Sequence, residues 1–175
     1  MRFTNNLTEY GSISKFFHWL SATVLLIQIP LGFYLVGLEF DEKKLAVENL
    51  HVLLGLSIFI LTLLRLVYKI FNPTPPLSNS IFPGQKIIAK LNHIFLYILI
   101  FIISISGALK KLFNGEILDI FFLNLEIKDN FNLAELFYDI HIFGNYTLVT
   151  LISLHILAVI AHKIIFKENL IKKIL

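Results

Sequence analysis

The chain has 175 residues, of which 57% are hydrophobic and 15% charged, and its formal net charge is +3. Soluble domains carry about 25% charged residues, so this composition, with a mean hydropathy of +0.78, excludes an ordinary soluble domain and predicts a membrane protein. The absence of cysteine excludes disulfides, iron–sulfur clusters and thioether-linked groups. No nucleic-acid-binding motif is present, and the length predicts a single domain, residues 1–175.

The N-terminal apolar run superficially resembles a secretory signal, because Arg2 and Lys15 stand at its start. The run extends from Ile13 to Leu38, which is too long for the apolar part of a signal, and no small-residue cleavage site lies near its end. We therefore predict that this segment is retained as a membrane span.

Four segments are long and apolar enough to cross a hydrocarbon layer about 30 Å thick, which requires roughly 20 residues. They cover about residues 14–36, 50–71, 88–112 and 138–166. The proline-rich stretch 73–76 separates the second from the third, because proline fixes φ and removes a hydrogen-bond donor. We predict an all-α membrane fold, a bundle of four transmembrane helices.

The longest connection, residues 113–137, alternates apolar and acidic side chains, as around Asp119. We expect this connection to lie along the membrane interface as a short amphipathic piece and not to span the bilayer.

Charge along the chain predicts the orientation of the bundle. With alternating spans, ten lysine and arginine residues lie on the side of the termini and five on the opposite side. Because cytoplasmic loops are enriched in these residues, both termini are predicted to be cytoplasmic. Ten of the twelve acidic residues lie on the opposite, outer side, which therefore has a net charge of −5.

Two histidines of the last span, His141 and His155, are 14 residues apart. In an α-helix this separation is a rise of about 21 Å and a rotation about 40° short of four full turns. The two imidazoles therefore share one helix face at two depths. Two stacked cofactors would need this arrangement, and haem is the first candidate because neutral imidazole ligates haem iron.

Alternating span directions sort the histidines into two groups. The outer pair is His51 and His141, and the remaining four form an inner cluster: His18, His93, His155 and His162. Histidines from facing helices could clamp an iron atom from both sides. The outer group has one possible pair, whereas the inner cluster has three candidate ligands, since His162 is expected to lie too close to water.

Glycines and one arginine fit the same two layers. Gly32 follows His18 by 14 residues and Gly107 follows His93 by 14, so both are expected in the outer layer, where a missing Cβ would give a porphyrin edge room. Arg65 follows His51 by 14 residues. It could pair with a haem propionate in the inner layer or extend its charged end to the interface.

This set of residues resembles the bacterial cytochrome b561 family over nearly the whole chain. The resemblance rests on the segment Ser14-Lys15-Phe16-Phe17-His18-Trp19, on His51 with Gly55 and Arg65, on Pro73-Thr74-Pro75-Pro76, and on His93, His141, His155 and His162.

The resemblance implies a bundle enclosing two b haems in the bacterial inner membrane. It assigns His18 and His155 to the inner iron and His51 and His141 to the outer iron. His93 and His162 are left as neighbours of the ligands or as propionate or quinone contacts. For the short members of the family that this chain resembles, it implies an oxidoreductase that takes electrons from superoxide at the periplasmic side and reduces ubiquinone.

Two other functions are considered. The acidic outer face could dock a basic partner, which would make the chain a conduit between the quinone pool and a periplasmic redox protein, or a dehydrogenase or hydrogenase subunit. An anionic donor such as superoxide would favour a basic entrance, which Lys110 and Lys111 could form locally. A haem-free transporter or metal-binding protein is disfavoured, because the spans offer few polar residues besides Ser, Thr and Arg65.

Overall fold

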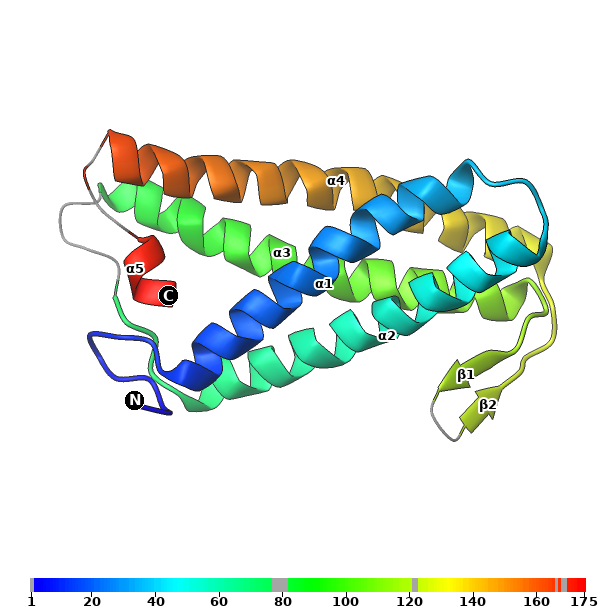
Figure 1. The fold of residues 1–175 in the computed structure, drawn as a ribbon, viewed down its shortest axis with the longest axis horizontal. Coiled ribbons are helices and arrows are strands. Elements are labelled where there is room, and N and C mark those ends of the chain that lie inside the picture. The colour runs from blue at the N-terminus through cyan, green and yellow to red at the C-terminus, as the bar shows by residue number, and fades with distance from the viewer. Residues whose placement is uncertain (1, 77–81, 121–122, 166, 168–169) are drawn as a thin grey trace.

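Four long helices form the protein in the computed structural model, which describes residues 2–76, 82–120, 123–165, 167 and 170–175 (Figure 1). They are α1 (Ser12–Val36), α2 (Glu42–Phe71), α3 (Pro83–Phe113) and α4 (Phe131–Ile164). Each is long and apolar enough to cross a membrane. The prediction of four helices able to span a membrane is therefore confirmed by their length and composition. Position 166, the predicted end of the last span, lies outside the described residues.

All four helices begin before the apolar segments predicted from the sequence, and two of them, α2 and α4, begin with a side-chain cap. Helix α2 begins at Glu42, and the Asp41 side chain accepts a hydrogen bond from the Lys44 amide at 2.8 Å. Helix α4 begins after Asn130, whose side chain accepts from the Leu133 amide at 3.2 Å. Such caps satisfy amides that have no partner within the helix, so each helix continues beyond its apolar part.

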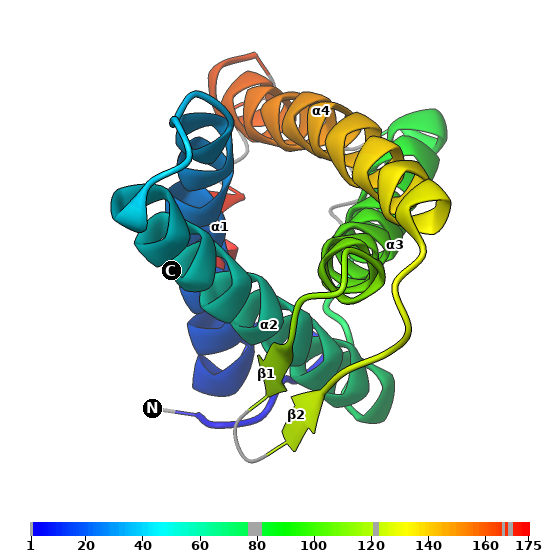
Figure 2. The ribbon, with the colours of Figure 1, turned by 90° about the vertical axis from the view of Figure 1, so that its right-hand side faces the viewer.

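The four helices run around a common axis (Figure 2). Helix α1 packs mainly on α2, α3 packs mainly on α4, and α2 also contacts α3. Both chain ends lie at the same end of the bundle (Figure 1), as an even number of spans requires. The opposite end, where the α1–α2 connection lies, is called the outer end after the orientation predicted from the charges, and the end with the termini is called the inner end.

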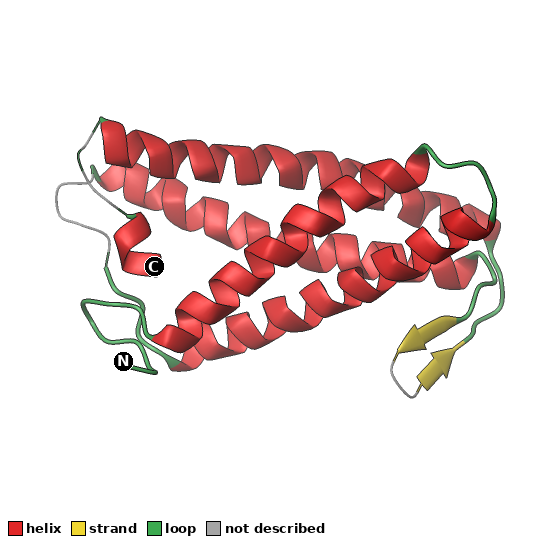
Figure 3. Cartoon of the chain, viewed as in Figure 1, coloured by secondary structure: helices red, strands yellow, loops and turns green. Residues whose placement is uncertain are grey.

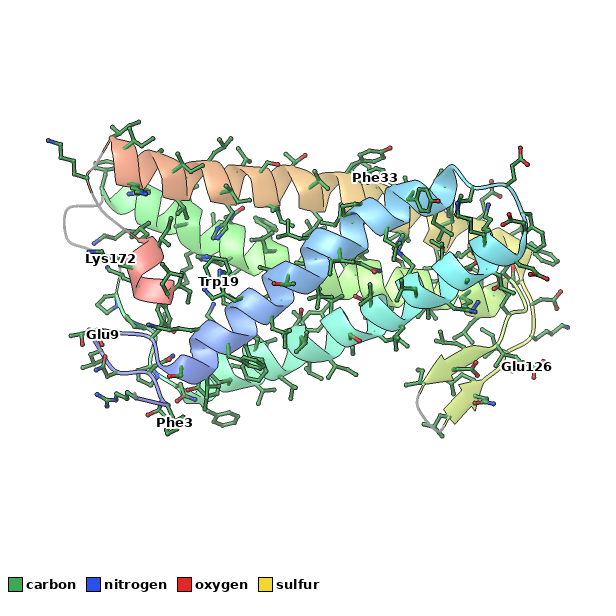
Figure 4. The ribbon with its side chains drawn as sticks, in the orientation of Figure 1. Phe3, Glu9, Trp19, Phe33, Glu126 and Lys172 are labelled. Carbon is green, nitrogen blue, oxygen red and sulfur yellow. The ribbon has the colours of Figure 1, made fainter. Side chains whose placement is uncertain are left out.

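The short helix α5 (Ile171–Ile174) returns to the bundle beside α1. The indole Nε1 of Trp19 donates a hydrogen bond to the Ile174 backbone oxygen at 2.9 Å, and Figure 4 shows Trp19 on α1 facing this C-terminal segment. At the same end, the buried side chain of Asn5 donates to the Pro73 backbone oxygen at 3.0 Å and accepts from the Gly11 amide at 2.9 Å. These contacts hold both termini against the inner end.

The connection between α3 and α4 contains a β-hairpin, with β1 (Leu118–Ile120) paired antiparallel to β2 (Leu123–Leu125) (Figure 3). The sequence left the conformation of this amphipathic piece open, and the structure gives it as a hairpin; its position at the membrane interface stays a prediction. The alternation of apolar and polar residues around Asp119 has the period of a strand. Leu118 is 2% exposed and lines the outer cavity described below, so the hairpin covers part of the outer end.

Candidate functional site

His51 of α2 and His141 of α4 face each other at the outer end of the bundle. Their ring centroids are 6.1 Å apart and their planes are inclined by 71°. Both line a cavity of about 350 Å³ whose walls come from all four long helices. The predicted outer pair is therefore brought together inside the bundle, from helices that are distant in sequence.

The separation of this pair suits one metal ion between the two rings. A first-row metal ion holds an imidazole nitrogen at about 2.0 Å, and that nitrogen lies about 1.1 Å from the ring centre, so two ligands in line would place their centroids about 6 Å apart. No group of three or more His, Asp or Glu side chains able to hold a metal occurs among the described residues. Two facing imidazoles suit a centre that needs only two protein ligands, as haem iron does.

The orientation of His141 is fixed by a hydrogen bond. Its Nδ1 lies 2.8 Å from the backbone oxygen of Ile103 on α3. Because the carbonyl oxygen can only accept, Nδ1 carries the proton and Nε2 keeps its lone pair. This arrangement leaves the nitrogen that would ligate iron free.

Gly32 and Gly107 lie directly beside the outer pair. A Cβ added to Gly107 would be 2.9 Å from Cε1 of His141, and a Cβ added to Gly32 would be 3.0 Å from Cε1 of His51. Both distances are shorter than ordinary carbon contacts of about 3.5–4.0 Å. The glycines thus give room to the imidazoles themselves, and room for a porphyrin edge stays a prediction.

The inner end gathers three histidines and Arg65. The rings of His93 and His155 are 5.1 Å apart, centroid to centroid. The guanidinium Nη2 of Arg65 lies 2.9 Å from Nδ1 of His18, and its Cζ is 5.7 Å from the centroid of the Tyr97 ring. His155 thus contacts His93 in this structure, and the pairing of His155 with His18 stays a prediction. His162 lies in the last turn of α4.

The contact between Arg65 and His18 determines which ring nitrogen of His18 carries the proton. Guanidinium groups donate only, so His18 accepts at Nδ1 and carries its own proton at Nε2. In that tautomer Nε2 has no lone pair for a metal. Ligation of iron through Nε2 of His18 therefore requires Arg65 to release the ring, and a haem propionate would be an alternative partner for it.

An ion-pair network at the mouth of the outer cavity was not expected from the sequence. Lys111 Nζ lies 2.6 Å from Glu116 and 3.9 Å from Glu48, and Lys110 Nζ lies 3.7 Å from Glu48. Burial by itself would raise the pKa of Glu116. Hydrogen bonds from Lys111 and Asn114 lower this pKa by a larger amount, so it lies below its ordinary value. The two lysines that could form a basic entrance are thus paired with carboxylates.

Gln28 of α1 also belongs to this site, although the sequence patterns did not single it out. It is 9% exposed and lines the outer cavity, and its Nε2 donates to the backbone oxygen of His51 at 2.9 Å. A polar side chain within an apolar span is a signal of function, and this signal was present in the sequence.

A four-helix membrane bundle with facing histidines in its core belongs to the structural class of membrane-bound cytochromes. Comparison with protein families supports this classification and makes it specific. Residues 9–175 match the family described as prokaryotic cytochrome b561, so the chain belongs to that family. Membership implies an electron-transfer protein with b-type haem and a multi-pass location in a bacterial membrane.

Two curated relatives align with nearly the whole chain. The first is "Cytochrome b561 homolog 2" of Escherichia coli (strain K12), which is 28% identical over 179 residues, an alignment that covers 100% of this chain and 95% of the relative. The second is "Probable superoxide oxidase CybB" of Yersinia pestis, which is 24% identical over 163 residues, covering 92% of each chain.

Proposed function

We propose that the chain is a di-haem electron-transfer protein of the bacterial inner membrane, with residues 1–175 as one domain and both termini in the cytoplasm. The observation that carries the proposal is the outer pair, in which two imidazoles from facing helices line one cavity at a separation suited to an iron ligand pair. His51 and His141 would hold the outer haem. His18 and His155 would hold the inner haem, in line with the family resemblance.

The residues of the chain perform five tasks in this proposal. A bound haem b supplies one-electron redox chemistry at its iron. The imidazoles hold the iron, the hydrogen bond from His141 to Ile103 keeps its Nε2 deprotonated, and Gly32 and Gly107 allow close approach of helices and rings. Arg65 would neutralise the negative charge of a haem propionate at the inner end. The apolar helices keep water away from the path between the two layers.

The proposed overall reaction is oxidation of superoxide at the periplasmic end and reduction of ubiquinone in the membrane. Two superoxide ions each lose one electron and leave as dioxygen, while one ubiquinone takes up these two electrons and two protons to become ubiquinol. The named activity of the Yersinia pestis relative supports superoxide as the donor.

The outer face supports a second candidate, a conduit for a periplasmic redox protein or a dehydrogenase or hydrogenase subunit. This face is acidic, and its Lys110 and Lys111 are paired with Glu48 and Glu116. An acidic surface attracts a basic protein and not an anion such as superoxide.

The cofactor content is tested first. A reduced-minus-oxidised absorption spectrum with a haem-to-protein ratio should give two b haems per chain. His51→Ala should lower that ratio to one, and separate alanine variants of His18, His93 and His155 identify the inner ligands by which of them lose the second haem. A colourless wild-type protein would overturn both redox functions.

The donor is tested with the same purified protein, superoxide and a soluble ubiquinone analogue. We expect quinol formation above the spontaneous rate, with His51→Ala as the inactive control. No excess over the spontaneous rate would refute the superoxide function. Rates with a basic donor protein that fall as salt is added would favour the conduit, because screening weakens electrostatic docking.

A further inference from the structure

Gln28 presents a buried hydrogen-bond acceptor beside the outer pair. Its Nε2 is engaged by the backbone oxygen of His51 at 2.9 Å. Its Oε1 is buried and has no hydrogen-bond partner in the part of the chain that the structure describes. A buried polar atom without a partner costs free energy, and each such atom in a native protein calls for an explanation.

His51 presents the matching unpaired atom. Its Nδ1 is also buried and without a hydrogen-bond partner among the described residues. A Cβ built on Gly32 would lie 3.0 Å from Cε1, 3.6 Å from this Nδ1 and 3.9 Å from Nε2, so the Cε1 corner of the ring faces α1 and Nδ1 is the nearer of the two nitrogens. Gln28 precedes Gly32 by four residues and therefore lies on the same face of α1, one turn away. The unpaired acceptor and the unpaired nitrogen thus lie beside the same cavity on adjacent helices.

The two histidines of the outer pair differ in this respect. His141 has an acceptor for its Nδ1 proton, the Ile103 backbone oxygen at 2.8 Å. A neutral imidazole that binds a metal through Nε2 carries its proton on Nδ1, and that proton is normally donated to an acceptor that fixes the ring and raises its basicity. His51 lacks such a partner in the described structure, and Gln28 Oε1 is a buried acceptor without a partner on a residue that lines the same cavity.

We propose that Gln28 is a positioning residue for His51. Its Nε2 anchors α1 to the His51 backbone oxygen, and its Oε1 accepts the Nδ1 proton when Nε2 ligates the outer iron. This inference rests on the proposed haem site. A more basic imidazole stabilises the oxidised iron, so Gln28 would lower the reduction potential of the outer haem.

The test is a potentiometric titration of the purified holo-protein, followed by absorption, together with electron paramagnetic resonance of the oxidised haems. Gln28→Met removes both polar atoms with little change in size. We expect one of the two haem transitions to rise by about 59 mV, which is a tenfold change in the ratio of reduced to oxidised haem, and one of the two low-spin signals to shift. The other transition should not move.

Two further variants separate positioning from packing. Gln28→Glu keeps an acceptor oxygen in the same place, so the potential should stay at or below that of the wild type. Gln85→Met makes the same chemical change at the start of α3, away from the outer cavity, and should leave both potentials unchanged. Loss of the outer haem in Gln28→Met with its retention in Gln28→Glu would support the same role.

Two results would overturn the inference alone: unchanged potentials in a fully loaded Gln28→Met protein, or equal loss of the outer haem in Gln28→Met and Gln28→Glu. A wild-type protein that contains no haem would instead overturn the proposed function, and this inference with it. The spectrum of the wild type therefore distinguishes the two failures before any variant is examined.

Discussion

Replacing Gly107 by alanine places a methyl group against the His141 ring. The added Cβ would lie 2.9 Å from Cε1 and 3.0 Å from Nδ1 of His141. Ordinary carbon contacts begin at about 3.5 Å, so the ring or the helix must shift by about 0.6 Å. The ring cannot move freely, because its Nδ1 is held 2.8 Å from the Ile103 oxygen.

A shift of this size exceeds the tolerance of about 0.5 Å within which a metal-binding constellation must be held. Loss of the hydrogen bond to Ile103 would add to the effect, since removal of such a partner typically lowers metal affinity 10-fold to 100-fold. We therefore expect Gly107→Ala to weaken haem binding at the outer site by at least about tenfold. Haem per chain should fall from two towards one.

The measurement is the haem-to-protein ratio of the purified variant, followed by titration of the haem-depleted protein with haem. Gly37→Ala is the matched control, because a Cβ there would lie 3.6 Å from the Tyr34 oxygen, an ordinary contact, and φ at Gly37 is −83°. Full haem content and wild-type affinity in Gly107→Ala would refute the reasoning. Equal losses in both glycine variants would show that the effect is not specific to the ring contact.

Three further predictions concern stability. The pKa of Glu116 is lowered in the folded chain, because its hydrogen bonds from Lys111 and Asn114 outweigh the effect of burial. The contribution of Glu116 to stability is therefore complete above the unfolded pKa of about 4.3, and it is lost as the pH falls through the lower folded pKa. Glu116→Gln should accordingly reduce thermal stability in detergent at pH 7 but not at the lowest pH, and a deficit that does not change with pH would contradict this. Asn5→Ala leaves a buried backbone amide without its acceptor, so the free energy of unfolding should fall by about 1–3 kcal/mol; an unchanged denaturation midpoint would count against it. Gly144→Ala brings a Cβ to 2.8 Å from Ile103 Cγ1 and should lower the melting temperature by crowding α3 against α4, whereas an unaltered melting curve would show that this contact can relax.

The sequence by itself determined the heights of the candidate residues along the bundle. Rise and rotation per residue are local properties of an α-helix, so counting 14 residues from His141 to His155, or from His51 to Arg65, is enough to assign a layer. The structure brings Arg65 to the level of His18 and His93 to the level of His155, as this counting predicts. The runs of apolar residues in the sequence likewise predicted the four spans.

Only the tertiary structure decided which side chains of one layer meet. The rotation of each helix about its axis and its choice of neighbours depend on packing, so the contact of His155 with His93 and the approach of Gln28 to His51 do not follow from spacing. The pairing of Lys111 with Glu116 depends on the turn after α3 and on the hairpin that follows. Heights are set within a single helix, whereas partners are set between helices by side-chain packing.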